Sequence, residues 1–286
     1  MRKRSNTAGP TLTIPNRDSG PITMQQASET SIAHNEHSEL CESMTSRVQA
    51  HRDEFHTLGN EPAPQIVVEI AVGRVYDLVW RNELGGLTFR IEDEFLKWSP
   101  RSTGVDLERE VVRLEWLLGR HPAPRVLAWG ADDDAQWLHT AALPGEHAVG
   151  AAWRARSSEA ISAIGHGLRA IHAVSIDEFP VDWTEQSWVS RTPDALEPRP
   201  PVDHPVLVHG DACAPNTLIS TEGLWTGHVD FGALAVGDRW ADLAIASLSL
   251  DWNFGEGRQH ELFTEYGIEP DERRIRYYRD LWKLES

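Results

Sequence analysis

A segment in the last third of the chain, residues 206–232, constrains the fold most. The apolar run from Val206 to His209 predicts a strand, and a loop of small and polar residues follows it up to Asn216. Two more short strands are expected before the triplet Asp230-Phe231-Gly232. Because strands of this length are joined by tight turns, we expect the polar residues in those turns to converge.

Three polar residues of this segment have the spacing of a phosphoryl-transfer site. An Asp that accepts the proton of an alcohol must lie near a metal ligand, and the spacing of Asp211 and Asn216 places both on one loop. Asp230 arrives on the next hairpin and can supply a further Mg²⁺ ligand, because Mg²⁺ prefers oxygen donors. Asp and Asn are also common in plain β-turns, so each half of the pattern alone is weak. The ordered combination favours catalysis, with His209 bracing the loop through hydrogen bonds.

A lysine and a glutamate in the first half of the chain predict a phosphate-binding pair. Lys97 lies in the apolar strand 94–98, and Glu110 lies on the apolar face of a helix predicted over 105–118. An unpaired buried charge is costly, so we expect each of the two to be the partner of the other. Their pairing would direct Lys97 to the α- and β-phosphates of ATP. Taken alone, a surface lysine and a solvated glutamate would be the better interpretation, and it is the downstream motif of Asp211, Asn216 and Asp230 that favours the functional pair.

The distribution of apolar residues predicts an α+β fold in which a small β-rich lobe precedes a helical lobe. Residues 1–60 contain too few apolar side chains to form a core, and we expect a disordered tail. Residues 61–140 are expected to form the N-terminal nucleotide-binding lobe, and residues 141–286 the C-terminal catalytic and substrate lobe. The expected strands of the first lobe are Ile66–Val68, Val75–Trp80, Leu87–Ile91, Glu94–Trp98, Arg125–Trp129 and Trp137–Thr140, and the expected helices of the second are Ser158–Ala173, Arg239–Leu250 and Asp271–Leu284.

Composition and charge exclude several classes of protein. Hydrophobic residues make up 40% and charged residues 25% of the chain, as in an ordinary folded domain. The formal net charge of −17 would repel nucleic acid and anionic membranes, so neither is an expected partner. Only two cysteines occur, Cys41 and Cys213, and no apolar run is long enough to span a bilayer, so the expected location is cytoplasmic. An oligomeric state is not indicated.

A series of ordered motifs covers residues 69–284. They are Arg74-Val75-Tyr76, Phe95-Leu96-Lys97, Glu108-Arg109-Glu110, Leu143-Pro144-Gly145, His209–Asn216, Asp230-Phe231-Gly232 and Asp238-Arg239-Trp240. This series resembles the aminoglycoside O-phosphotransferases, particularly the 3′-type, within the protein-kinase-like superfamily. The resemblance implies a two-lobed kinase-like fold with ATP between its lobes. It also implies Mg²⁺-dependent phosphorylation of a hydroxyl on a cationic, aminoglycoside-like antibiotic, and hence antibiotic resistance.

The resemblance further implies roles for individual residues. Asp211 would be the catalytic base, and Asn216 and Asp230 would be the Mg²⁺ ligands. The residues implied in nucleotide binding are Lys97 and Glu110 at the phosphates, Phe95 beside adenine, and Thr140 and Ala142 in the hinge, whose backbone groups would hydrogen-bond adenine. Asp242 is similar to the structural acid with which the family braces its catalytic loop.

Three departures from the family pattern leave other functions open. Residues 69–73 are Glu-Ile-Ala-Val-Gly where the family's nucleotide loop usually has Gly and Ser, so a hydroxyl contact to phosphate is lost. The segment between His172 and His209 is shorter than the helical insert that 3′-type members place over the drug. Lys283 stands where relatives usually carry acidic residues. The alternatives are a kinase of the same fold that acts on another small-molecule alcohol, and a catalytically silent nucleotide-binding relative. Cys213 is interpreted as a packed side chain rather than a nucleophile.

Overall fold

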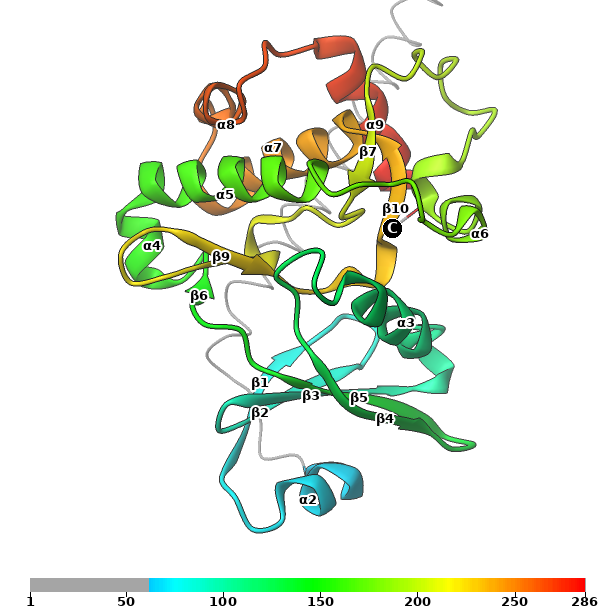
Figure 1. The fold of residues 1–286 in the computed structure, drawn as a ribbon, viewed down its shortest axis with the longest axis vertical. Helices are drawn as coiled ribbons and strands as arrows, with labels where there is room; N and C mark the ends of the chain where they lie inside the picture. The colour runs from blue at the N-terminus through cyan, green and yellow to red at the C-terminus, as the bar shows by residue number, and fades with distance from the viewer. Residues whose placement is uncertain (1–61, 286) are drawn as a thin grey trace, which may run out of the picture. The chain divides into compact units, whose positions relative to one another are not determined.

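The computed structural model describes residues 62–285 of the chain. The expected disordered tail, residues 1–60, lies outside the described residues. The described part is an α+β fold in which an antiparallel sheet comes first and most of the helices follow (Figure 1). Between residues 62 and 285, no helix is long and apolar enough to cross a bilayer.

A five-stranded antiparallel sheet forms the core of the amino-terminal lobe. Its strands are β1 (Tyr76–Arg81), β2 (Leu87–Ile91), β3 (Glu94–Pro100), β4 (Val126–Ala131) and β5 (Ala135–Ala141), in the order β1-β2-β3-β5-β4. The strands predicted at these places are confirmed. Phe95 and Lys97 of β3 lie directly opposite Thr140 and Leu138 of β5. Residues that face each other across two strands point to the same side, so these side chains share one face of the sheet.

The other face of the sheet is covered by a helix at the position of an expected strand. Helix α2 (Gln65–Ala71) buries Val67 and Ala71, which lie one turn apart, in a cluster that contains Leu96 of β3. The expected strand Ile66–Val68 is therefore wrong. β-Branched residues favour strands by less than about 1 kcal/mol each, and burying one face of a helix against the sheet outweighs that preference.

Helix α3 (Leu107–Leu117) packs on the face of the sheet that carries Lys97. Asp106 caps the start of the helix, because its side chain accepts a hydrogen bond from the Arg109 N–H at 3.0 Å. The buried apolar residues of α3 recur three or four positions apart and pack against Leu138 of β5. The helix predicted over 105–118 is confirmed.

Helices dominate the carboxy-terminal lobe. They are α4 (Ala151–Ala155), α5 (Ser157–His172), α6 (Val181–Glu185), α7 (Trp240–Phe254), α8 (Gln259–Tyr266) and α9 (Glu272–Glu285), with short 3₁₀ turns η1 (Arg101–Thr103) in the first lobe and η2 (Trp188–Ser190) in this one. The helices predicted over 158–173, 239–250 and 271–284 are confirmed as α5, α7 and α9. Helix α7 is buried along most of its length, and α5, α8 and α9 pack around it (Figure 1).

Two small antiparallel sheets of the carboxy-terminal lobe hold the loops of the site. Strand β7 (Pro205–Val208) pairs with β10 (Ala235–Asp238), and β8 (Thr217–Ile219) lies between β6 (Glu146–His147) and β9 (Trp225–His228). Turn η3 (Ala214–Asn216) leads into β8, and turn η4 (Phe231–Ala233) follows β9. The predicted strand 206–209 is confirmed as β7, and its partner β10 comes after the Asp-Phe-Gly triplet. The loops after β7 and β9 lie between β7 and β10 in the chain, so the pairing of these two strands brings both loops into the same part of the lobe.

Candidate active site

A lysine, a glutamate and an aspartate from three elements meet next to the sheet. Lys97 of β3 donates to both carboxylate oxygens of Glu110 on α3, at 2.7 and 2.8 Å. Lys97 also forms an ion pair with Asp230, which follows β9. The Glu110 side chain is 8% exposed, whereas those of Lys97 and Asp230 are 27% and 43% exposed. The expected Lys97–Glu110 pair is present, and its lysine remains accessible to a ligand.

Burial and charge compete in setting the pKa values of this group. Burial opposes the charged form of Lys97, but the carboxylates of Asp230 and Glu110 outweigh it, so the pKa of Lys97 is raised. Burial also opposes ionisation of Asp230, but the Lys97 ammonium outweighs it and lowers the pKa of Asp230. For the more enclosed Glu110, burial raises the pKa, and Lys97 offsets part of the effect. At neutral pH the site therefore presents a cation suited to phosphate and, at Asp230, an anion suited to a metal ion.

The loop after β7 brings Asp211 and Asn216 together. The Asn216 amide nitrogen donates to the backbone oxygen of Asp211 at 2.9 Å and to its Oδ2 at 3.0 Å. The Val229 N–H donates to the backbone oxygen of Asn216 at 3.0 Å, which places Asn216 next to the residue before Asp230. Because Asp211 uses the amide nitrogen of Asn216, the side-chain oxygen of Asn216 is left to bind a cation.

The donors at this place fit a magnesium ion that is shared with phosphate groups. Within residues 62–285, no group of three or more His, Cys, Asp or Glu residues could hold a metal ion. Mg²⁺ is usually bound by one or two carboxylates together with substrate phosphates and water, not by a cage made of protein alone. The oxygens of Asn216 and Asp230 match the protein part of such a site.

Buried hydrogen bonds fix the catalytic loop. Asp242 of α7 accepts the backbone N–H of His209 at 2.6 Å and that of Gly210 at 2.9 Å. His209 Nε2 donates to Val229 O at 2.8 Å, and its Nδ1 accepts the Asp211 N–H at 3.2 Å. These contacts confirm the bracing roles predicted for His209 and Asp242. Gly210 has φ of 81°, and a Cβ there would lie 2.2 Å from the carbonyl oxygen of Ala233, so only glycine fits.

The backbone at Asp230 is itself unusual. Asp230 has φ of 66°, in the left-handed region that residues other than glycine seldom adopt. Such a conformation costs on the order of 1–3 kcal/mol and persists only where surrounding contacts impose it. The ion pair with Lys97 and the fully buried side chain of Phe231 are contacts of that kind. The turn is thus held in a shape that directs the Asp230 carboxylate to the lysine.

The three residues expected around adenine lie at one end of the sheet. Phe95 and Thr140 are cross-strand neighbours on the same face as Lys97. The Ala142 N–H, however, donates to the backbone oxygen of Asp93 at 2.8 Å. Of the Ala142 backbone groups, only the carbonyl therefore remains for a nucleotide. The hinge role expected for Thr140 and Ala142 stays a prediction, and for Ala142 this geometry restricts it to the carbonyl oxygen.

The segment expected to replace the family's nucleotide loop is mostly helical. Residues 65–71 form α2, and Val72 and Gly73 end the helix with left-handed backbone, at φ of 49° and 80°. Arg74 then forms an ion pair with Glu94 at the start of β3, at 2.8 Å, and His139 of β5 contacts the same carboxylate at 2.9 Å. An ion-paired arginine thus follows the helix directly before β1.

Three residues that the sequence patterns did not indicate also contact the loops of the site. The Ser249 hydroxyl accepts the Ala214 N–H at 2.9 Å, and His147 Nδ1 donates to Pro215 O at 2.6 Å, so both support the catalytic loop. Ser249 lies seven positions after Asp242, hence on the same face of α7, and this spacing was available in the sequence. The third residue is Arg113 of α3, whose contacts depend on tertiary packing.

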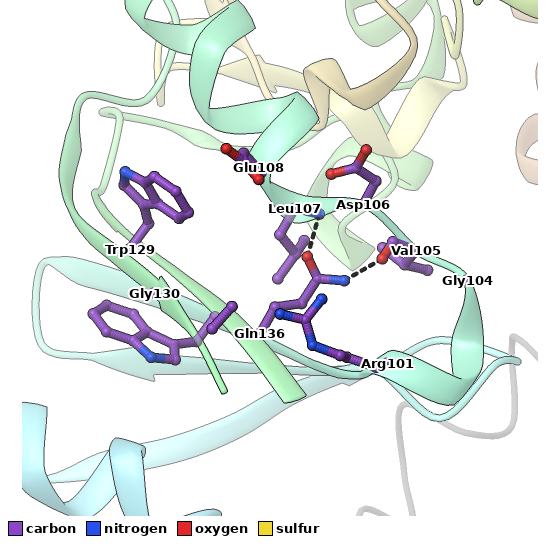
Figure 2. A pocket seen from close by; sticks show the side chains of 11 residues that line it. Arg101, Gly104, Val105, Asp106, Leu107, Glu108, Trp129, Gly130 and Gln136 are labelled. Carbon is purple, nitrogen blue, oxygen red and sulfur yellow. Dashed lines mark hydrogen bonds between the residues drawn. The ribbon is translucent and has the colours of Figure 1, made fainter. Parts of the chain in front are cut away.

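A separate cavity lies beside the first turn of α3. The space has a volume of about 320 Å³ and is lined by Trp129, Trp137, Gln136 and the residues that start the helix. Figure 2 shows it from close by, with Trp129 and Gln136 labelled. None of the predicted site residues lines it. The side chain of Gln136 on β5 accepts the Leu107 N–H at 2.8 Å, so it ties the start of α3 to the sheet (Figure 2).

A lysine–glutamate pair between a small sheet and a helix, an Asp-x-x-x-x-Asn loop and an Asp-Phe-Gly turn together define a kinase-like phosphotransferase. The sequence profile of the phosphotransferase enzyme family (APH) matches residues 80–195 and 188–278. The chain belongs to this family.

Characterised relatives agree with this membership. An aminoglycoside 3′-phosphotransferase of Niallia circulans is 30% identical over 218 residues, which covers 66% of this chain and 83% of the relative. The streptomycin 3″-kinase of Streptomyces griseus is 31% identical over 274 residues, which covers 78% of this chain and 98% of the relative. The solved structure of the aminoglycoside phosphotransferase APH(3″)-Id of Streptomyces rimosus, in complex with ADP and streptomycin, shares the fold. It has a TM-score of 0.57 at 22% identity and covers 77% of this chain and 97% of its own.

Proposed function

We propose that this protein is an ATP- and Mg²⁺-dependent kinase that phosphorylates a hydroxyl group of a cationic aminoglycoside antibiotic. The observation that carries the proposal is the meeting of Lys97, Glu110 and Asp230, which come from both halves of the chain. Residues 61–140 would then form the nucleotide-binding lobe and residues 141–286 the catalytic and substrate lobe. The names of the relatives and the acidic net charge of −17 support a cationic acceptor.

The first lobe would bind the nucleotide. Lys97 would contact the α- and β-phosphates, and Glu110 would hold the ammonium in place through its two hydrogen bonds. Phe95 would pack beside adenine, with Thr140 and the carbonyl of Ala142 at its edge. Because Lys97 is partly exposed, phosphate can reach it without breaking the pair with Glu110.

The second lobe would hold the metal ion and the acceptor. Asn216 and Asp230 would bind Mg²⁺ through their side-chain oxygens. When bound, the ion would offset negative charge on the phosphates during transfer. The Asp211 carboxylate would orient the acceptor hydroxyl and take its proton, and the Asn216 amide keeps that carboxylate in place through Oδ2.

A screen that couples ADP release to a spectroscopic signal tests the proposal. The purified chain should release ADP from MgATP when an aminoglycoside is added, and the Asp211→Ala variant should not. The variant should still bind MgATP in a calorimeter, since Asp211 contacts the acceptor. Near wild-type turnover by Asp211→Ala would remove this residue from the mechanism.

Two alternatives are tested by the same screen. Residues 62–75, the described residues before β1, contain no Ser or Thr that could contact phosphate, and this observation favours a silent nucleotide-binding relative. This alternative predicts MgATP binding without turnover on any acceptor. A kinase of another small-molecule alcohol predicts turnover on non-antibiotic alcohols only. Lys283, which motivates that reading, lies 3.4 Å from Asp280, so part of its charge is offset locally.

A further inference from the structure

Arg113 of α3 is a buried charge without a carboxylate partner in direct contact. Its side chain is 1% exposed and lies among the largest fully buried groups of the described chain. Within residues 62–285 no ion pair includes it; its guanidinium donates instead to two backbone carbonyls. Nε donates to Leu234 O at 3.0 Å, and Nη1 donates to Gly232 O at 2.8 Å. Burial lowers the pKa of Arg113 to about 10, so the group stays charged at neutral pH.

The two carbonyls belong to the turn that follows Asp230. Glu110 lies one helical turn before Arg113, and its carboxylate faces the Phe231 backbone, which helps to lower its pKa against the effect of burial. Two side chains on one face of α3 therefore hold the backbone of residues 231–234. Asp230, directly before this stretch, has the left-handed φ described above. The hydrogen bonds from α3 thus fix the turn directly after Asp230, the residue with the unfavourable left-handed backbone.

The same helix is tied to the sheet at its other end. Gln136 of β5 accepts the Leu107 N–H at 2.8 Å and donates to the backbone oxygen of Val105 (Figure 2). Helix α3 is therefore anchored to the first lobe through Gln136 and to the loops of the second lobe through Arg113.

We infer that Arg113 is a positioning residue that holds the metal-binding turn: it fixes the backbone after Asp230 so that Asp230 and Glu110 both face Lys97 before a nucleotide binds. The inference rests on the proposed function, in which Asp230 is a Mg²⁺ ligand. A buried guanidinium is costly to desolvate, and its retention here is explained by two carbonyls that a planar fork can bind together. Partners that orient a metal ligand typically change metal affinity by about 10- to 100-fold when they are replaced.

The test compares Arg113→Lys with Arg109→Lys on the same helix. Lysine keeps the charge, but its single ammonium cannot reproduce the fork that spans the Gly232 and Leu234 carbonyls. Arg109 is 39% exposed and pairs with Asp106 at 3.7 Å, so it controls for a changed arginine on α3. The dissociation constants of MgADP and of ADP without Mg²⁺ are measured by calorimetry. Amide hydrogen exchange of residues 229–236 is followed by mass spectrometry.

For Arg113→Lys we expect MgADP to bind at least about tenfold more weakly, with metal-free ADP affinity within about twofold of wild type. Exchange of residues 229–236 should be faster, and turnover should fall with little change in the KM of the acceptor. Arg109→Lys should match wild type in every measurement. Arg113→Met is a second variant, which removes the donors altogether and should weaken MgADP binding further if it folds.

Wild-type MgADP affinity and exchange rates in Arg113→Lys would overturn the inference. So would a loss of stability alone, with unchanged MgADP binding at a temperature where the variant is folded, because that result assigns Arg113 a structural role only. Binding and exchange do not depend on the acceptor. If wild type phosphorylates no acceptor while MgADP binding and amide exchange of Arg113→Lys change as expected, the inference stands and the proposed acceptor is wrong.

Discussion

Two buried histidines make the stability of this protein dependent on pH. His121 Nε2 and His228 Nδ1 lie 3.0 Å apart in a hydrogen bond, and the two rings are nearly parallel, at 6°. Both side chains are buried next to Trp225. Burial lowers the pKa of His121 to about 3 and lowers that of His228 well below its ordinary value.

The direction of the effect follows from these lowered pKa values. Below about pH 6.5 the unfolded chain takes up protons at both histidines and the folded chain does not, so acid favours unfolding. With pKa values of about 3 folded and about 6.5 unfolded, His121 alone removes about 1.4 kcal/mol of stability at pH 5.5 and less than about 0.1 kcal/mol at pH 7.5. His228 acts in the same direction.

The assay compares wild type with His121→Gln in urea unfolding at pH 7.5 and at pH 5.5. Glutamine does not titrate, and its amide can still bond to His228 as donor or acceptor. Relative to the variant, wild type should lose about 1.4 kcal/mol between the two pH values. Titrating groups that do not interact with His121 are present in both proteins and cancel in the comparison; His228 does interact with it, but burial is the larger cause of its lowered pKa. An equal pH dependence of the two proteins would show that burial does not hold His121 neutral.

Three further variants and one labelling experiment test other parts of the structure. Lys97→Met should raise the KM for ATP and lower kcat/KM in steady-state assays, while the fold monitored by circular dichroism stays intact; unchanged kcat/KM would exclude the phosphate role. Glu110→Gln should lower kcat/KM less than Lys97→Met, because the amide still offers one acceptor to the ammonium. Asp242→Asn should lower the free energy of unfolding by about 3 kcal/mol, because one of the two buried N–H groups loses its acceptor. In a thermal scan this corresponds to a drop in Tm of roughly 2–4 °C per kcal/mol, and an unchanged Tm would contradict the bracing role. Burial raises the pKa of the Cys213 thiol, and the nearby Asp211 charge adds to the effect. Cys213 should therefore alkylate slowly in the folded protein at pH 8 and rapidly in urea, and equally fast labelling in both states would be inconsistent with a packed side chain.

The alternation and spacing of apolar residues predicted most of the strands. They also predicted the residue pairs whose contact follows from the geometry of a single helix, strand or loop. The alternation of β3 and the helical spacing of α3 indicated Lys97 and Glu110 as partners, because an unpaired buried charge is unfavourable, but only the downstream motif with Asp211 made this interpretation the favoured one. The Asp211–Asn216 spacing likewise placed both residues on one loop. These contacts follow from periodicity and charge, which a single sequence contains.

Tertiary packing decided what the sequence left open. Residues 65–71 have a β-branched composition, yet they form α2 because burying Val67 and Ala71 on the sheet outweighs local preference. Strand β10 pairs with β7 across an intervening hairpin, and local pattern does not reveal such a pairing. The engagement of the Ala142 N–H by Asp93 depends on the register between β3 and β5. The contacts of Arg113 depend on the position of a turn more than a hundred residues away in sequence.

In the proposed reaction, one phosphate moves from ATP to an aminoglycoside hydroxyl at a site built from Lys97, Asp211 and Asp230. The most direct measurement incubates the protein with MgATP and streptomycin or another aminoglycoside and analyses the drug by mass spectrometry and ³¹P NMR. We expect a drug carrying one phosphate ester with the wild-type protein and unmodified drug with Asp211→Asn. Unmodified aminoglycosides after reaction with a wild-type protein that binds MgATP would contradict it.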